Sequence, residues 1–247
     1  MVAIVVVNGS GVLTDAEVSA VIPALQRYDD ELLRPAWALE PATYSFMNWH
    51  QFPWDQYRAD PTIFQPIFVN RHSTDPGALG FHEDQTELNR IFGRIFAGDC
   101  LRYGISWTVD LSHEAGEMRI DPQTNRTVTL PDGRIALVEV CDPVEDDLQA
   151  VTIDGVKLSN VVKPNYFFLS SVNPDVVSPT PLPGPWDYGG HLTGPCPTLT
   201  AGGYQELLEN GQWTQEARRL SGGPWSYRTE RWNAGSHRRR RIAVPMP

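Results

Sequence analysis

Residues 111–122 read LSHEAGEMRIDP, and this stretch decides both the fold and the chemistry that we predict. In an α-helix, residues four positions apart lie on one face, about one turn from each other. His113 and Glu117 can therefore hold one cation together, through an imidazole nitrogen and a carboxylate oxygen. Glu114 is rotated roughly 100° from His113 around the helix axis. It cannot share the ligand position, but it can reach a water beside the cation.

This spacing is that of the HExxH metallopeptidase motif, in which two residues of one helix bind zinc and the glutamate between them takes a proton from water. Here Glu117 stands where the motif has its second histidine. We predict His113 and Glu117 as metal ligands and Glu114 as the general base. The alternative is a solvated helix with an incidental histidine, because exposed helix faces are rich in charged residues.

A zinc site needs at least a third protein ligand. A second acidic cluster follows at residues 139–147, for which the alternative interpretation is a solvated turn. We rank Asp142 first as the third ligand, because Pro143 fixes the backbone directly after it. Glu139 ranks next and Asp121 third. The expected cofactor is Zn²⁺, although a carboxylate-rich site also suits Ca²⁺ or Mn²⁺.

The chain before this motif predicts several strands and one amphipathic helix. Residues 3–7 form a β-branched run typical of a buried strand. Thr14 and Glu17 form a capping-box signature that opens a helix, which we expect to end at Pro35. Further strands are predicted at 43–52, 67–70, 78–82 and 90–97, and a helix at 104–119.

The strand at 78–82 follows a strong turn signal and is predicted to be a short edge strand. An edge strand before the last strand, followed by a helix, is the arrangement of zincin peptidases, in which the edge strand binds extended peptide by backbone pairing. We therefore expect Gly80 and His82 to contact substrate, and His82 is also a candidate for contact with the metal. Gly116 costs about 1 kcal/mol relative to Ala within a helix, which suggests close approach of another backbone.

The predicted fold class is α+β, with a zincin-like mixed sheet and two main helices. Strands are also expected at 127–129, 135–141, 151–153 and 156–158. From residue 173 the chain becomes rich in Pro, Gly and Trp. We predict a zincin-like domain over residues 1–172 and an irregular extension over residues 173–247, with short helical turns at 206–208 and 214–220.

Composition excludes several classes of protein. The formal net charge of −10 argues against a nucleic-acid partner, because phosphate contacts need a basic face. No apolar run approaches the roughly 20 residues of a membrane span, and no signal peptide is visible. The three cysteines lack the spacing of a metal or redox pair, and we interpret them as reduced thiols in the cytoplasm.

Two motifs together resemble a known family. The sequence is similar to uncharacterised bacterial and phage proteins that carry Ser-His-Glu-x-x-Glu-x-x-x-Asp-Pro, here Ser112–Pro122, and then Glu-x-Cys-Asp-Pro-x-Glu, here Glu139–Glu145. The resemblance covers most of residues 1–205. It implies a zincin-like fold and the same candidate ligands, and its phage members imply the virion as an alternative location.

Two functions follow as hypotheses. The first is a metal-dependent, metallopeptidase-like hydrolase that acts on a peptide or protein substrate. The second is a structural or assembly protein of a phage particle, built on a degenerate zincin-like scaffold. In the second case the arginine run Arg238–Arg241 and the Pro-rich loop would mediate a homo-oligomer or a larger assembly.

Overall fold

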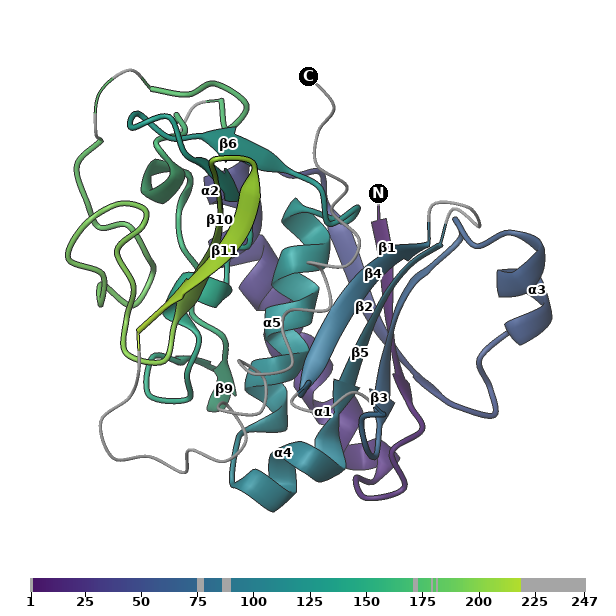
Figure 1. Cartoon of the computed structure of the whole chain (residues 1–247). Coiled ribbons are helices and arrows are strands. Elements are labelled where there is room, and N and C mark those ends of the chain that lie inside the picture. The colour runs from purple at the N-terminus through teal and green to yellow at the C-terminus, as the bar shows by residue number, and fades with distance from the viewer. Residues whose placement is uncertain are drawn as a thin grey trace.

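A five-stranded mixed sheet forms the centre of the protein, as Figure 1 shows for this computed structural model. The structure describes residues 2–74, 78–85, 90–170, 173–178, 180 and 182–218, with only the backbone for 84, 85 and 90. In spatial order the strands are β2 (Ala42–Asn48), β1 (Val2–Asn8), β3 (Gln65–Asn70), β5 (Arg90–Phe96) and β4 (Gly80–Gln85). Only β4 runs antiparallel to its neighbour, and it lies at the edge of the sheet. The predicted α+β class and the edge strand are confirmed.

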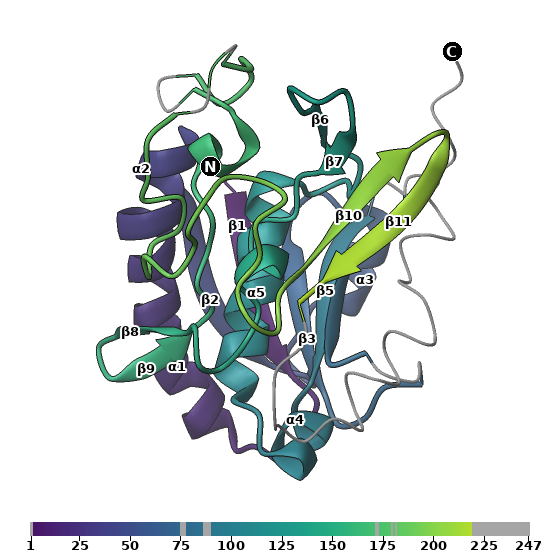
Figure 2. The ribbon, with the colours of Figure 1, turned by 60° about the vertical axis from the view of Figure 1, so that its left-hand side comes forward.

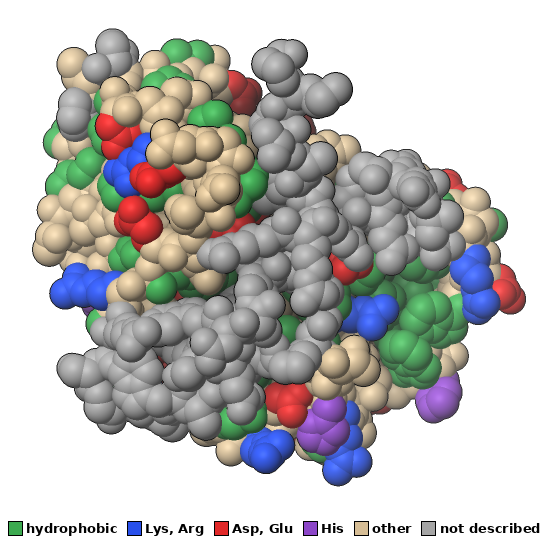
Figure 3. All heavy atoms as spheres, in the orientation of Figure 1, with side chains coloured by type: hydrophobic (Ala, Val, Ile, Leu, Met, Phe, Trp, Pro, Cys, Tyr) green, Lys and Arg blue, Asp and Glu red, His purple; other side chains and the backbone are tan. Residues whose placement is uncertain are grey.

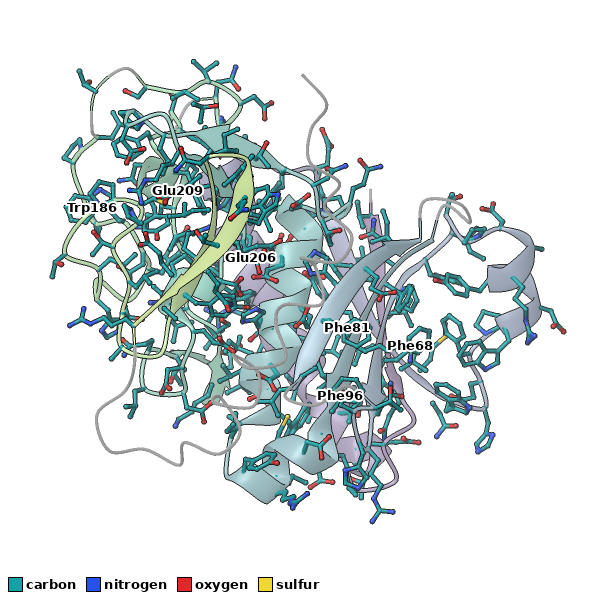
Figure 4. All side chains as sticks on the ribbon, in the orientation of Figure 1. Phe68, Phe81, Phe96, Trp186, Glu206 and Glu209 are labelled. Atoms are coloured by element: carbon teal, nitrogen blue, oxygen red, sulfur yellow. The ribbon has the colours of Figure 1, made fainter. Side chains whose placement is uncertain are left out.

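The two faces of the sheet are covered differently, and strand β1 shows why. Its alternate residues Ile4 and Val6 belong to the main core, whereas Val5 and Val7 belong to a second, aromatic-rich core. Because successive side chains of a strand point to opposite faces, a continuous apolar run is needed when both faces are covered. Figure 2 shows α1 and α5 on one side of the sheet and α3 on the other.

Helix α1 (Asp15–Tyr28) begins as predicted, because the Thr14 side chain accepts from the Glu17 amide and Glu17 reaches back to residue 14. The predicted end at Pro35 is wrong. The chain continues through a π-helical turn, Asp29–Leu33, into α2 (Arg34–Trp37). Arg34 bonds to the carbonyl five residues back, and this wider turn accommodates a proline ring that a regular helix would exclude.

The helix predicted at 104–119 is α5 (Trp107–Ile120), and α4 (Ala97–Tyr103) precedes it. Gly104, in the left-handed region at φ 69°, ends α4 and separates the two helices. The short helices α2, α3 (Trp54–Ala59) and α4 add to the two long helices that were predicted. Within the described residues, no helix is both long enough and apolar enough to cross a bilayer.

A second sheet packs beyond α5. Its order is β11 (Gln212–Ala217), β10 (Tyr204–Glu209), β7 (Ile135–Leu137) and β6 (Thr127–Thr129), and a separate hairpin joins β8 (Val151–Ile153) to β9 (Val156–Leu158). The strand predicted at 135–141 thus ends early, as does the one at 43–52, of which only 42–48 is β2.

The segment after residue 173 is therefore not wholly irregular. Strand β10 pairs with β7 through Leu207 and Ala136, so the extension shares a sheet with the preceding chain. The helical turns predicted at 206–208 and 214–220 are wrong for the described residues, which form the antiparallel pair β10 and β11. Asn210-Gly211, both with positive φ, makes the tight turn between them. The arginine run Arg238–Arg241 lies outside the described residues.

Candidate metal centre

Helix α5 is buried around its whole circumference. Every residue from Val109 to Ile120 is buried, including the charged residues of the motif. The Ser112 hydroxyl donates to carbonyls of the preceding turn and accepts from the Ser159 amide at 2.6 Å, which ties the helix to the chain after β9. The interpretation of a solvated helix with an incidental histidine is therefore wrong. Such a helix must satisfy its charges inside the protein.

His113 and Glu117 meet on one face of α5, and a third group joins them. His113 Nε2 lies 3.2 Å from Glu117 Oε1 and 3.2 Å from Asp142 Oδ1. One nitrogen carries at most one hydrogen, so it cannot donate a linear bond to both oxygens. Ligands held about 2.1 Å from a tetrahedral zinc are about 3.4 Å apart. The observed spacing thus matches a set of ligands around one cation.

The segment that carries Asp142 is fixed by its surroundings. Residues 139–141 leave β7, and Asp142 opens a short 3₁₀ turn, Asp142–Val144. The Pro143 carbonyl accepts from the amide and the hydroxyl of Thr200. A Cβ on Gly203 would lie 2.2 Å from that carbonyl oxygen, so only glycine fits there. The region after residue 173 therefore holds Asp142 in place.

The edge strand β4 brings two more residues to the same place. A Cβ on Gly80 would lie 2.6 Å from Glu114 Oε1, which shows that Glu114 packs directly against this strand. His82, on the same face of β4, lies 3.4 Å from Glu114 Oε2 and 3.5 Å from Glu117 Oε2 through its Nδ1. Its Nε2 lies 3.0 Å from the Asp121 carbonyl oxygen. His82 is 1% exposed, so it lies within the centre and not on an open surface.

Two groups of buried side chains have ligand atoms within 4.8 Å of one another and could bind a metal ion. One is His113, Glu117 and Cys141, and the other is His82, Glu117 and Glu139. Seven of the eight candidate residues from the sequence thus converge: Glu114, His113, Glu117, Asp142, Glu139, Gly80 and His82. The eighth, Asp121, does not bring its carboxylate to the centre, because that group accepts from the amides of Asn125 and Arg126, and only its backbone carbonyl faces His82.

The centre has a strongly negative field. Burial lowers the pKa of His113, but Glu117, the Cys141 sulfur and Asp142 together raise it well above its ordinary value. Burial raises the pKa of the Cys141 thiol, whose Sγ donates to the His113 carbonyl. The raised pKa of His113 means that the surrounding groups attract positive charge, whereas that of Cys141 arises mainly because burial disfavours the thiolate.

Sequence reasoning missed Cys141 as a candidate ligand. The signal was its place between Glu139 and Asp142, but spacing alone does not tell which side chains of an irregular segment point inward. Gly116 also has a different role from the one predicted. A Cβ there would lie 3.3 Å from Cys141 Sγ and 3.4 Å from the Tyr28 hydroxyl, so side chains and not a backbone approach this glycine.

The centre thus combines two imidazoles, four carboxylates and one thiol, contributed by β4, α5 and residues 139–142. Nitrogen, oxygen and sulfur donors at these separations are the ligands of zinc and related divalent metals. Comparisons of the chain with protein-family models, with curated proteins and with solved structures found no match.

Proposed function

We propose that this protein is a metal-dependent hydrolase of the metallopeptidase type, with Zn²⁺ held by His113, Glu117 and Asp142. The observation that carries the proposal is the position of His113 Nε2, 3.2 Å from an oxygen of each carboxylate in a buried site. A structural alternative would rest on the arginine run, which lies outside the described residues.

In this proposal some residues of the chain bind the metal and another acts as the general base. His113, Glu117 and Asp142 bind the cation, and Cys141 lies close enough to join them. A zinc ion in such a site acts as a Lewis acid and makes a coordinated water easier to deprotonate. In this proposal Glu114, one residue along the helix from His113, takes that proton. Its carboxylate is 5% exposed and is held between His82 and the Gly80 backbone, so its orientation is fixed before substrate binds.

A peptide is the proposed substrate because of strand β4. Strand β4 is the edge strand of the described five-stranded sheet, where it pairs with β5. Backbone pairing on an exposed sheet edge is a common way to hold a peptide. Because Gly80 of β4 touches Glu114, a peptide along this strand would lie next to the general base. The order of β4, β5 and the motif helix is also the order on which we based the sequence prediction of a zincin-like peptidase.

The test compares metal content and hydrolysis in matched variants. Protein purified without chelator is analysed by mass spectrometry for metal and assayed against a library of quenched fluorescent peptides. Glu114→Gln is expected to retain its metal and to lose about 10²- to 10⁴-fold in the rate of hydrolysis, the usual contribution of a general base. Glu31→Gln, which removes an exposed carboxylate paired with Arg27, serves as the control and retains both.

His113→Ala is expected to lose the cation held by Glu117 and Asp142 and, with it, the activity. Two results would overturn the proposal: a wild-type protein that takes up no divalent metal, or a Glu114→Gln variant as active as the wild type.

A further inference from the structure

Glu117 faces two histidines at once, one with each carboxylate oxygen. Its Oε1 lies 3.2 Å from His113 Nε2, and its Oε2 lies 3.5 Å from His82 Nδ1. The two histidines come from different elements, since His113 is on α5 and His82 is on β4. A carboxylate can bind one cation through each oxygen, whereas a neutral imidazole has only one lone pair to offer. Glu117 is thus placed where only an acid can serve both sides.

The orientation of His82 makes its Nδ1 a ligand atom. Its Nε2 lies 3.0 Å from the Asp121 carbonyl oxygen, which can only accept, so Nε2 carries the hydrogen. In the neutral ring the Nδ1 lone pair then points at oxygens of Glu114 and Glu117, at 3.4 and 3.5 Å. A lone pair that faces two carboxylates is repelled by both. A cation bound by His82 Nδ1 and the Glu117 oxygen converts this repulsion into attraction.

Glu114 supplies an independent observation. Its Oε2 is buried and has no hydrogen-bond partner among the described residues, although the side chain is only 5% exposed. That oxygen lies 3.4 Å from His82 Nδ1, the atom that faces Glu117 Oε2, whereas His113 faces the other oxygen of Glu117. A buried carboxylate oxygen without a donor is costly unless a cation faces it.

The number of buried charged groups also favours two bound cations. Four buried carboxylates, Glu114, Glu117, Glu139 and Asp142, surround two histidines. One divalent cation would leave an excess of negative charge in this buried space, whereas two divalent cations carry the same total charge as four carboxylates. Two-metal hydrolytic sites hold their ions about 3.5–4 Å apart and bridge them with shared ligands.

We propose that the centre binds two divalent cations, the second held by His82, Glu117 and Glu139, with Glu117 bridging the pair. The first cation is that of the proposed function, on which this inference rests for its site. The bridge gives a physical reason for a glutamate at position 117, where the HExxH motif has a histidine. His82 is then a metal ligand and not a substrate contact.

The experiment counts metal ions per folded chain. The protein is stripped with chelator, loaded with Zn²⁺ or, separately, with Mn²⁺, freed of excess metal by gel filtration, and analysed by native mass spectrometry. Two ions per chain are expected for the wild type. His82→Ala is expected to retain one ion and His113→Ala the other. His72→Ala, at an exposed histidine that pairs with Asp99, is the control and retains two.

The count separates the two proposals. A wild-type protein with one ion overturns the second site and leaves the proposed function standing, whereas a protein with none overturns both. Two ions in His82→Ala would remove His82 from the centre. Glu117→His gives a further check in a helix that keeps its other residues, because it restores the HExxH spacing without a bridge and is expected to bind one ion. Circular dichroism establishes that each variant is folded before its metal is counted.

Discussion

Helix α5 buries two sets of charged side chains, and they are balanced in different ways. Towards α1, Arg119 Nε lies 2.7 Å from Asp29 Oδ1, with side chains 4% and 0% exposed. Arg119 also donates to the Glu40 carbonyl. One cation and one anion thus neutralise each other within the chain. Towards β4 and residues 139–142, the carboxylates outnumber the histidines.

This difference indicates which set of charged side chains needs a bound cation to balance its charge. A buried charge is tolerated when a partner compensates for the lost hydration. Arg119 and Asp29 compensate each other within the chain, so the cost of breaking this pair should not depend on metal. In the candidate metal centre the carboxylates outnumber the histidines, so under the proposed function its stability depends on added cations. Removal of metal by a chelator should therefore affect the stability of the metal centre and not that of the Arg119–Asp29 pair, although both lie on α5.

The largest expected effect is in the balanced pair. Arg119→Ala leaves Asp29 as a buried, unpaired carboxylate, and breaking such a pair costs about 3–5 kcal/mol in the free energy of unfolding. Urea denaturation in chelator and with saturating Zn²⁺ measures this loss, which should be the same in both. A loss below about 1 kcal/mol, or one that depends on zinc, would show that the two regions are not independent.

Asp110 adds a third way to bury a carboxylate, which is to keep its proton. Burial raises the pKa of Asp110 from its ordinary value of 3.8 to about 7, and the Cys100 thiol donates to it at 3.0 Å. Between pH 4 and pH 7 the unfolded chain ionises this group while the folded chain keeps it protonated. The wild type should therefore lose stability as pH rises through this window, by up to about 4 kcal/mol, and lose no more above it.

Asp110→Asn removes that dependence, because an amide does not titrate. With chelator present, the unfolding free energy of the variant should rise relative to the wild type between pH 4 and pH 8, with the same upper limit. Other carboxylates titrate equally in both proteins and cancel in the difference. A difference that does not change with pH would mean that Asp110 is ionised in the folded state.

The sequence predicted the regular parts of this architecture well. The β-branched run of β1 and the Thr14–Glu17 capping box are local signals, and the elements that they predict are present. Local patterns failed where tertiary contacts decide. Residues 204–217 have polar sequences that resemble helical turns, yet pairing of Leu207 with Ala136 makes them strands. Pairing partners distant in sequence leave no mark on local periodicity.

The candidate site likewise combines residues that local sequence patterns predict with residues whose positions depend on tertiary contacts. His113 and Glu117 follow from helical geometry, which is why they could be predicted as neighbours. Asp142 was ranked first among third ligands for its place before a proline, and the structure brings it to His113. The place of His82 between Glu114 and Glu117 depends on how β4 docks on α5, and no spacing in the sequence encodes that contact.

Added metal should stabilise the centre and leave the balanced pair unaffected. A ligand that binds only the folded chain stabilises it by about 2.7 kcal/mol at 100 times its dissociation constant. We expect wild-type protein to gain about this amount for each Zn²⁺ that it binds, measured by thermal or urea unfolding, and Arg119→Ala to gain as much from its lower starting point. His113→Ala should gain less than either. Equal gains in all three proteins would assign the effect to zinc bound elsewhere.

The smallest expected effect changes sign with metal, which makes it the sharpest test of the comparison. Glu139→Gln removes one like charge from the unbalanced cluster and supplies an amide that can donate to a neighbouring carboxylate. In chelator it should therefore stabilise the chain by about 1 kcal/mol. With saturating Zn²⁺ it should instead be less stable than the wild type, because a ligand is lost. Urea unfolding measures the difference in unfolding free energy between the variant and the wild type under each condition. A variant that is less stable than the wild type in chelator as well would show that other groups of the chain already balance the carboxylates of the centre.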